Sequence, residues 1–310
     1  MQLLSQTTNF NFMGPRRGLM TFSVIIVLIS LGSLAFRSLN FGIDFTGGVI
    51  LEISFPNAVE LEDVRADLTA AGYADALVQN FGSASDVLIR LPPPGDNEEA
   101  QSVGNTVLDA LADLNPNRPP LREEIVGSQV GSDLTEQGGL AMLFALIMIF
   151  GYVMLRFRWK FAAGAIIATV HDVVITVGFF SVLGLGFDLT VLAAVLAVIG
   201  YSLNDTIVVY DRIRENFRAM RRGTPEQIVN ASINQTLSRT LITALTTVLV
   251  LVALLFLGGE SVFGFSLALI VGIIVGTYSS IYVASAAALA LEVSPADLMP
   301  PKREEVDDMP

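Results

Sequence analysis

The chain has 310 residues, of which 52% are hydrophobic and only 15% are charged. This composition is too apolar for a water-soluble protein of this size and indicates a membrane protein that crosses the bilayer several times. The chain has no cysteine and one histidine, His171, which excludes disulfide bonds, thiolate metal ligands and metal sites built from several histidines.

Six apolar stretches predict transmembrane helices, because about 20 mainly apolar residues span the hydrocarbon core of a bilayer. They are residues 19–36, 138–155, 161–184, 189–210, 236–257 and 263–290. Arg16 and Arg17 precede the first stretch as they would a secretory signal, but no small-residue cleavage site is obvious after it and five more spans follow. We therefore interpret the first stretch as an uncleaved transmembrane helix.

Basic residues predict the orientation of these spans. They gather at alternate ends of successive spans, in the segments 16–17, 156–160, 212–222 and 302–303. Because all four segments can face the cytoplasm at once, both termini are expected there. The predicted cytoplasmic parts are the N-terminus 1–18, the tail 291–310, and a loop, 211–235, within the helical region 138–290. The segment 38–137 is then extracytoplasmic.

The extracytoplasmic segment 38–137 is predicted to form one small domain. Its apolar patterns and turn residues indicate strands at 49–55, 76–81, 86–91 and 121–130, and helices at 60–72 and 98–114. The order β-α-β-β-α-β is that of a ferredoxin-like domain. The predicted fold class is therefore a polytopic α-helical membrane protein with six transmembrane helices and an α+β ferredoxin-like domain between the first two.

This segment also carries the charge imbalance of the chain. It contains 17 acidic and 4 basic residues, a net charge of −13, beside −12 for the whole chain. Such acidity opposes nonspecific contact with nucleic acid, so we expect no nucleic-acid partner.

A helix start is predicted inside the cytoplasmic loop, at Thr224-Pro225-Glu226-Gln227, which has a capping threonine, a proline at the first helical position and a glutamine at the third. This helix either continues into the fifth span or breaks near Ser238. The tail from Ser294 contains several prolines and acidic residues and is predicted to be disordered.

Ionisable residues inside the spans are the first candidates for function, because charge is costly in lipid. Asp205 precedes Arg212, the first arginine at the cytoplasmic end of its span, by seven residues, or roughly 10 Å along a helix. Arg239 enters the fifth span at a similar depth, so the two side chains could form an ion pair. Alternatively, Arg239 extends to the cytoplasmic headgroups, and Asp205 makes a structural contact beside Asn204.

Asn204, Asp211 and His171 are weaker candidates for the proton pathway. Asp211 marks the interface or the cytoplasmic helix end, or has a direct role. His171 lies deep in the third span, where it either joins a proton path or donates a hydrogen bond to a neighbouring carbonyl. Asp172 projects about 100° away from His171 around the helix, so the two need not share a partner.

Small residues in the spans indicate close helix contacts. Gly164, Ala168, Gly272 and Gly276 fit this role, and we interpret them as packing positions. The chain has no phosphate-binding loop, nucleophile triad or paired-carboxylate hydrolase motif. We therefore expect no enzymatic activity, no cofactor or metal, and no ATP-driven step.

Several motifs together resemble the SecF family of bacterial protein-export subunits. They are FGIDFTGG (41–48), VGSQVGSDL (126–134), HDVVITVGFFS (171–181), VIGYSLNDTIVVYDRIRENFR (198–218), SRTLITALTT (238–247) and GTYSSIYVAS (276–285). The resemblance extends over residues 9–291, and the NDTIVV element also resembles the acidic motif of the resistance-nodulation-division transporters.

The resemblance implies a subunit in the cytoplasmic (inner) membrane that works beside the SecY/SecE/SecG channel, and possibly SecA. SecD would supply the other six helices and a further acidic residue. The pair would use the proton gradient to pull or hold unfolded exported polypeptide on the outer side. The family's essential aspartate and arginine fall on Asp205 and Arg239, with protons as the coupling ion.

We therefore expect a proton-coupled mechanical subunit. Asp205 accepts the proton, Arg239 stabilises its charge, and protonation lets the fourth and fifth helices repack and move the outer domain. Two rivals stay open. One is a small-molecule or lipid exporter, for which the outer domain of roughly 90 residues is small. The other is a passive scaffold for the channel.

Overall fold

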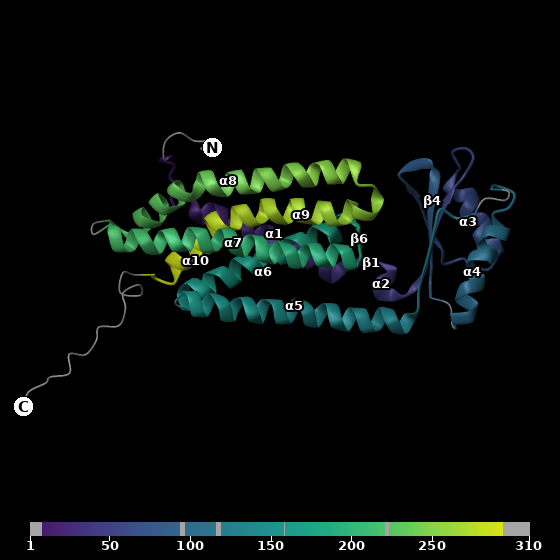
Figure 1. Cartoon of the computed structure of the whole chain (residues 1–310), viewed down its shortest axis with the longest axis horizontal. Helices are drawn as coiled ribbons and strands as arrows, with labels where there is room; N and C mark the ends of the chain where they lie inside the picture. Colours follow the sequence, from purple (N-terminus) through teal and green to yellow (C-terminus); the bar gives the residue numbers. More distant parts are fainter. Residues whose placement is uncertain (1–7, 94–96, 116–118, 158, 221–222, 294–310) are drawn as a thin grey trace, which may run out of the picture.

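The protein consists of a long helical bundle with a small α/β domain at one end (Figure 1). The computed structural model describes residues 8–93, 97–115, 119–157, 159–220 and 223–293. The predicted disorder of the tail from Ser294 lies outside these residues, as do the basic residues Arg158, Arg221, Arg222, Lys302 and Arg303.

Within the described residues, six helices are long and apolar enough to cross a membrane, which confirms the predicted membrane architecture. They are α1 (Arg16–Phe36), α5 (Ser128–Arg156), α6 (Trp159–Leu183), α7 (Leu189–Ala219), α8 (Pro225–Leu257) and α9 (Glu260–Ser279), the last continued by a π-helical turn, η1 (Ser280–Ala284), and by α10 (Ser285–Ala290). Several helices extend beyond the apolar stretches because polar residues continue the helix outside the bilayer.

The start of α8 at Pro225 confirms the helix start predicted from the sequence. The Thr224 side chain accepts a hydrogen bond from the Gln227 amide, and the Gln227 side chain accepts one from the Thr224 amide, which forms a complete capping box. The helix then runs to Leu257 without a break, so the alternative of a break near Ser238 is excluded.

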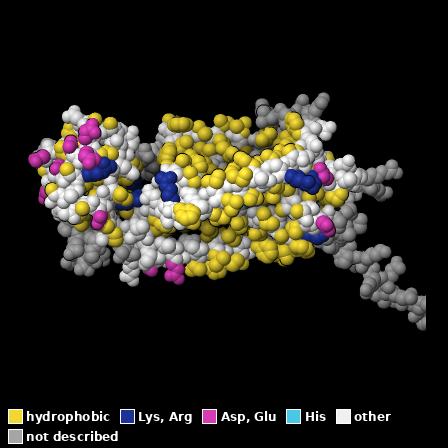
Figure 2. Space-filling model, turned by 180° about the vertical axis from the view of Figure 1, so that it is seen from behind, with side chains coloured by type: hydrophobic (Ala, Val, Ile, Leu, Met, Phe, Trp, Pro, Cys, Tyr) yellow, Lys and Arg dark blue, Asp and Glu magenta, His cyan; other side chains and the backbone are white. Residues whose placement is uncertain are grey.

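Helix α7 lies inside the bundle and packs against α6, α8 and α9. The outer surfaces of α1, α5 and α8 expose large apolar side chains, such as Leu28, Phe144 and Leu249. Figure 2 shows the hydrophobic band that covers the middle of the bundle, with charged side chains at its ends. Such a surface suits contact with lipid or with other transmembrane helices.

The small α/β domain lies within residues 38–137 and is called the outer domain below, after its predicted side of the membrane. It contains an antiparallel sheet with the order β3-β4-β2-β5. Its strands are β2 (Gly48–Ser54), β3 (Leu77–Phe81), β4 (Ser83–Leu91) and β5 (Arg122–Val126). Helices α3 (Leu61–Ala70) and α4 (Asn97–Ala110) cover one face, and their residues Val64, Leu68 and Val107 pack on the sheet to form its core. This arrangement confirms the ferredoxin-like prediction.

Several boundaries in this domain differ from the predictions; the helix predicted at 98–114, for example, ends at Ala110. The predicted turn at 82–85 is shorter, because Gly82 has a φ of 78° and β4 already begins at Ser83. The predicted last strand, 121–130, ends at Val126, and α5 begins at Ser128. The first turn of α5 packs closely against Phe45 and Gly47, because a Cβ on Gly131 would lie 2.7 Å from the Gly47 amide nitrogen.

Three short elements connect the domain to the bundle and were not predicted. They are β1 (Asn40–Phe41), α2 (Ile43–Thr46) and β6 (Gly186–Phe187). Strand β1 pairs in parallel with β6, which directly precedes α7. The chain entering the outer domain is therefore hydrogen-bonded to the outer end of α7.

The small residues predicted for helix packing lie at helix contacts. A Cβ atom on Gly272 of α9 would lie 2.1 Å from Cγ2 of Val198 in α7, and one on Gly276 would lie 3.0 Å from Cβ of Ser202. The two helices thus approach closely where α9 has no side chains.

We predict that Gly272→Ala destabilises the bundle by about 1–3 kcal/mol, because the added methyl group overpacks a stiff, buried valine. Gly200→Ala is the matched control, since a Cβ there has no neighbour within 4 Å. Thermal unfolding in detergent measures both. Equal unfolding temperatures for the two variants would contradict the assigned contact.

Candidate functional site

Asp205 lies in the packed interior of the bundle, with 7% of its surface exposed. Its Oδ1 accepts a hydrogen bond from the Thr240 hydroxyl of α8 at 2.6 Å, and its Oδ2 accepts one from the Ser280 hydroxyl of η1 at 2.5 Å. The carboxylate therefore joins three helical segments. Hydroxyl groups meet the charge directly, which offsets part of its cost of burial.

The predicted contact between Asp205 and Arg239 is not formed as an ion pair. Among the described residues, no basic side chain lies within 4 Å of the Asp205 carboxylate, although the charge of Arg239 acts on it from further away. Thr240, the next residue, occupies the face of α8 that meets α7, so Arg239 points outward and is exposed. A one-residue step rotates a helix by about 100°, which explains the difference.

The other residues of this segment lie apart from Asp205. Asn204 is exposed on the surface of the bundle. Asp211 pairs with Arg156 of α5 at 3.1 Å and with Arg214 at 2.8 Å. Asp211 is half-buried in these contacts. Because α7 continues to Ala219, Asp211 does not mark the end of the helix, and its position at the membrane interface stays a prediction.

His171 and Asp172 form a second polar cluster on α6. Nδ1 of His171 lies 2.9 Å from Oδ1 of Asp172, a direct contact that the sequence did not predict. The imidazole ring is long enough to bring Nδ1 to the neighbouring carboxylate. Asp172 is fully buried and also accepts hydrogen bonds from Ser202 of α7 and Ser279 of α9.

The π-helical turn η1 positions Ser280, and Tyr210 supports it. The Tyr210 hydroxyl donates a 2.9 Å hydrogen bond to the carbonyl of Ala284, the last residue of η1. Tyr210 is completely buried. A π-turn interrupts the regular helical hydrogen bonds and is frequent at functional sites.

The hydroxyl residues that hold the two carboxylates were not predicted as site residues. Thr240, Ser202, Ser279 and Ser280 all lie in the motifs SRTLIT, GYSLND and GTYSSIY. Serine and threonine are common in transmembrane helices and often bond to their own backbone. Only the helix packing shows which of them meet a carboxylate.

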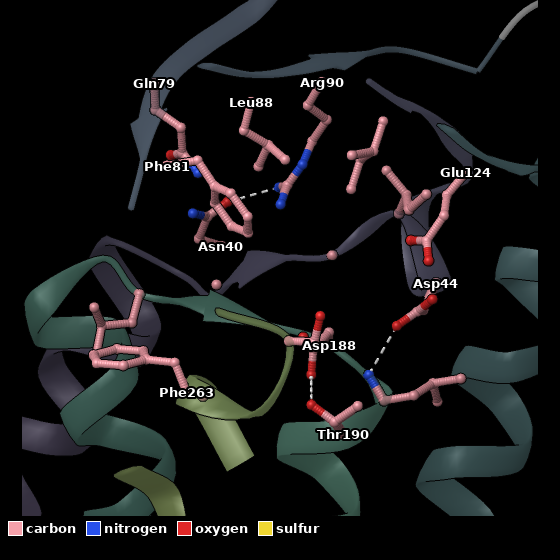
Figure 3. A pocket seen from close by; sticks show the side chains of 18 of the residues that line it. Asn40, Asp44, Gln79, Phe81, Leu88, Arg90, Glu124, Asp188, Thr190 and Phe263 are labelled. Atoms are coloured by element: carbon pink, nitrogen blue, oxygen red, sulfur yellow. Dashed lines mark hydrogen bonds between the residues drawn. The ribbon is translucent and has the colours of Figure 1, made fainter. Parts of the chain in front are cut away.

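A cleft of about 650 Å³ separates the open face of the outer sheet from the outer end of the bundle. Figure 3 shows Arg90 extending from β4 towards Asn40, with Asp44 and Asp188 below it. The Arg90 guanidinium donates hydrogen bonds to Asn40 Oδ1 at 3.4 Å and to the Phe41 carbonyl at 3.1 Å. Burial lowers the pKa of Arg90, and the charges of Asp188 and Asp44 oppose this shift.

The same cleft connects the outer domain to α7. Asp188 caps this helix by accepting a hydrogen bond from the Val191 amide at 2.8 Å. Asp44 of α2 accepts another from the Leu189 amide at 3.0 Å. The outer end of the helix that carries Asp205 is therefore tied to α2 through Asp44 and to the outer sheet through β1 and Arg90.

No cluster of three or more histidine or acidic side chains is arranged to hold a metal ion in the part of the chain that the structure describes. The buried carboxylates bind hydroxyl groups and an imidazole. This arrangement can bind and release a proton.

Comparison with known families gives two matches. The model for "Protein export membrane protein SecD/SecF, C-terminal" matches residues 106–294, and the "SecD/SecF GG Motif" model matches residues 32–58. The second match contains the FGIDFTGG segment, which includes β1 and α2.

Relatives with similar sequences extend over almost the whole chain. A protein translocase subunit SecF from Vibrio alginolyticus is 50% identical over 100% of this chain and 99% of its own length. The protein of the same name from Pseudomonas aeruginosa is 49% identical over 97% of each chain.

Solved structures of SecDF are also similar. The crystal structure of the translocon-associated membrane protein SecDF from Thermus thermophilus matches with a TM-score of 0.84 and 40% identity. A structure of SecDF in a super-membrane-facing form matches with a TM-score of 0.70. Each match covers 94% of this chain but only 40% of the SecDF chain.

We predict that Tyr210→Phe destabilises the protein by about 1 kcal/mol, because it removes the buried hydrogen bond from α7 to the Ala284 carbonyl. Tyr152→Phe is the control, since Tyr152 is 53% exposed. Denaturant titration of both variants measures the difference. Equal stability of the two would show that the Tyr210 hydroxyl does not support η1.

Proposed function

The chain belongs to the SecD/SecF family of protein-export membrane proteins, and we propose that it couples proton movement to export through Asp205. It is a multi-pass membrane protein with an accessory role in Sec protein export. The observation that supports proton coupling is the buried Asp205 carboxylate, which is held by two hydroxyl groups from different helices.

Proton binding at Asp205 would change the packing of the bundle. The charged carboxylate only accepts hydrogen bonds, and it accepts them from Thr240 of α8 and Ser280 of η1. A protonated carboxyl group must itself donate one, so at least one of these contacts has to reorganise. The proposed step is thus a change in how α7 meets α8 and η1.

We propose that a SecD-type partner completes the proton path. This chain covers 40% of the SecDF chain from Thermus thermophilus, so that protein contains much sequence beyond the matched part. Arg239 and Asn204 are exposed on the faces of α8 and α7 in the single chain. A partner that covers these faces would enclose Arg239 near Asp205 and strengthen their interaction, because water would be excluded.

Helix α7 would carry the change to the outer domain. Asp205 lies roughly 24 Å along α7 from Leu189, at 1.5 Å per residue. At that outer end, β6 pairs with β1, and Arg90 binds Asn40 and Phe41. A shift or rotation of α7 would therefore act on the outer sheet.

The remaining parts of the proposal are based on similarity to the relatives, which are named as protein translocase subunits. We propose a location in the bacterial inner membrane, with both termini cytoplasmic and residues 38–137 outside. The proposed partners are the SecY/SecE/SecG channel, SecA and unfolded exported polypeptide. The proton is the proposed coupling ion, without cofactor or enzymatic activity.

We predict that Asp205→Asn abolishes proton-dependent stimulation of export while the protein still assembles with its SecD-type partner. The amide has nearly the same shape but cannot take up a proton. Proton flux and export in vesicles that contain the pair and the channel are the measurements. Asp211→Asn should retain both activities, because Asp211 is paired with Arg156 and Arg214, apart from Asp205. Wild-type flux and export in Asp205→Asn would support a passive scaffold instead.

We also predict that Arg90→Gln separates the two activities. Proton flux should stay near the wild-type level, whereas export stimulation should fall several-fold because the outer sheet loses its contact with β1. Arg65→Gln is the control, since Arg65 bonds only to groups within the outer domain, Glu62 and the Val78 carbonyl. Unchanged export in Arg90→Gln would contradict the proposed route through this contact.

A further inference from the structure

Two acidic side chains are buried in the part of the chain that the structure describes, and the proposed function uses only one of them. Asp205 is 7% exposed, whereas Asp172 is 0% exposed. A fully buried carboxylate is costly unless it is hydrogen-bonded or protonated. No lysine or arginine of the described residues pairs with Asp172, so its neighbours must satisfy it by hydrogen bonds.

Asp172 has three such neighbours on three helices. Oδ2 accepts from the Ser202 hydroxyl of α7 at 2.5 Å and from the Ser279 hydroxyl of α9 at 2.7 Å, and Oδ1 faces His171 Nδ1 at 2.9 Å. Gly276 leaves room for Ser202 in this arrangement, because a Cβ there would lie 3.0 Å from Ser202 Cβ. The site therefore repeats the pattern of hydroxyl donors around Asp205.

Consecutive residues connect the two carboxylates. Ser279 donates to Asp172, and Ser280 donates to Asp205. Ser279 ends α9 and Ser280 begins η1, so the junction between the regular helix and the π-turn lies between the two sites. A movement of this junction at one carboxylate is transmitted directly to the other.

Each of these serines also has a second acceptor within reach. Ser279 Oγ lies 3.1 Å from the Gly276 carbonyl, and Ser280 Oγ lies 3.0 Å from the Thr277 carbonyl. A hydroxyl group has one hydrogen and can satisfy one acceptor fully. When the carboxylate takes up a proton and no longer needs this donor, the serine can turn to its backbone carbonyl.

His171 gives Asp172 a route for a proton. Its Nδ1 faces the carboxylate, and its buried Nε2 has no hydrogen-bond partner among the described residues. The ring lines a cavity of about 250 Å³ between α1 and α6, which Ser23 also lines and whose other walls are apolar. A proton bound at Nε2 can be matched by release of the Nδ1 proton to Asp172 Oδ1. The imidazole stays neutral and changes tautomer, and the carboxylate becomes a carboxylic acid.

The titratable groups around Asp172 are few. Tyr278 of α9 stacks on the His171 ring at 6.3 Å, and its hydroxyl bonds to Ser23 of α1. Asp205 of α7 is reached through Ser279 and Ser280. Helix α10 contains no ionisable residue, and α5 carries them only towards its ends, at Asp133, Glu136, Tyr152 and Arg156.

We propose that Asp172 is a second proton-binding group of the membrane domain, which exchanges its proton through His171 and is linked to Asp205 by Ser279 and Ser280. This inference rests on the proposed function, because it adds a site to the same proton path. It assigns the buried cluster on α6 a role beyond helix packing.

Infrared difference spectroscopy of the full chain in lipid bilayers tests this proposal. A protonated carboxyl group gives a C=O stretching band that a carboxylate or an amide lacks. Spectra are compared over one series of pH values for the wild type, Asp172→Asn, Asp205→Asn and His171→Gln. We expect each aspartate variant to lose one pH-dependent band and to keep the other, and His171→Gln to slow proton exchange at the Asp172 band.

The outcomes separate the two proposals. A spectrum of Asp172→Asn identical to the wild type, with a band lost in Asp205→Asn, would overturn this inference and leave the proposed function intact. The reverse result would contradict the role of Asp205 and retain Asp172 as a proton site.

A second variant tests the proposal even if Asp172→Asn does not fold. Ser279→Ala keeps the Asp172 carboxylate but removes one of its hydrogen-bond donors. Asp172 should then bind its proton about tenfold more tightly, which shifts the pH dependence of its band. Ser280→Ala is the matched control, because it removes a donor from Asp205 instead. An unshifted Asp172 band in Ser279→Ala would also overturn the inference.

Discussion

The cost of placing carboxylates inside an apolar bundle constrains the whole membrane domain. Asp205 and Asp172 are both buried, and serine and threonine hydroxyls meet both of them. Those hydroxyls come from α7, α8 and the α9–η1 segment, so these helices can satisfy the charges only in one relative arrangement. Close packing at Gly272 and Gly276 brings α9 near enough to α7 for this purpose. Proton binding would turn each carboxylate from a hydrogen-bond acceptor into a donor, so the helix contacts around it would have to change.

The outer domain is joined to this machinery at the end of α7. The pairing of β1 with β6, the cap of Asp188 and the contacts of Arg90 form one continuous set of polar interactions there. These groups lie around the cleft between the outer sheet and the end of the bundle (Figure 3). The helix that carries Asp205 is thereby the helix best placed to move the outer sheet.

Much of this architecture could be predicted from the sequence. Long apolar stretches indicate membrane spans, and the spacing of apolar and polar residues indicates which side chains of a helix or strand are buried. The six spans, the capping box at Thr224 and the split β-α-β-β-α-β order all follow from local patterns. The rotation of each helix does not, because it depends on neighbours distant in sequence. The sequence therefore indicated Asp205 and Arg239 at matched depth, but only the packing places Thr240 on Asp205 and turns Arg239 outward.

The central claim, that the protonation state of Asp205 sets the position of the outer domain, can be tested by a distance measurement. The chain has no native cysteine, so spin labels can be attached uniquely at two introduced ones. Exposed Thr69 on α3 and exposed Leu183 at the outer end of α6 are suitable positions. The label-to-label distance distribution, measured by electron resonance in the complex with a SecD-type partner, should differ between the wild type and Asp205→Asn at the same pH. Identical distributions at every pH would contradict the account.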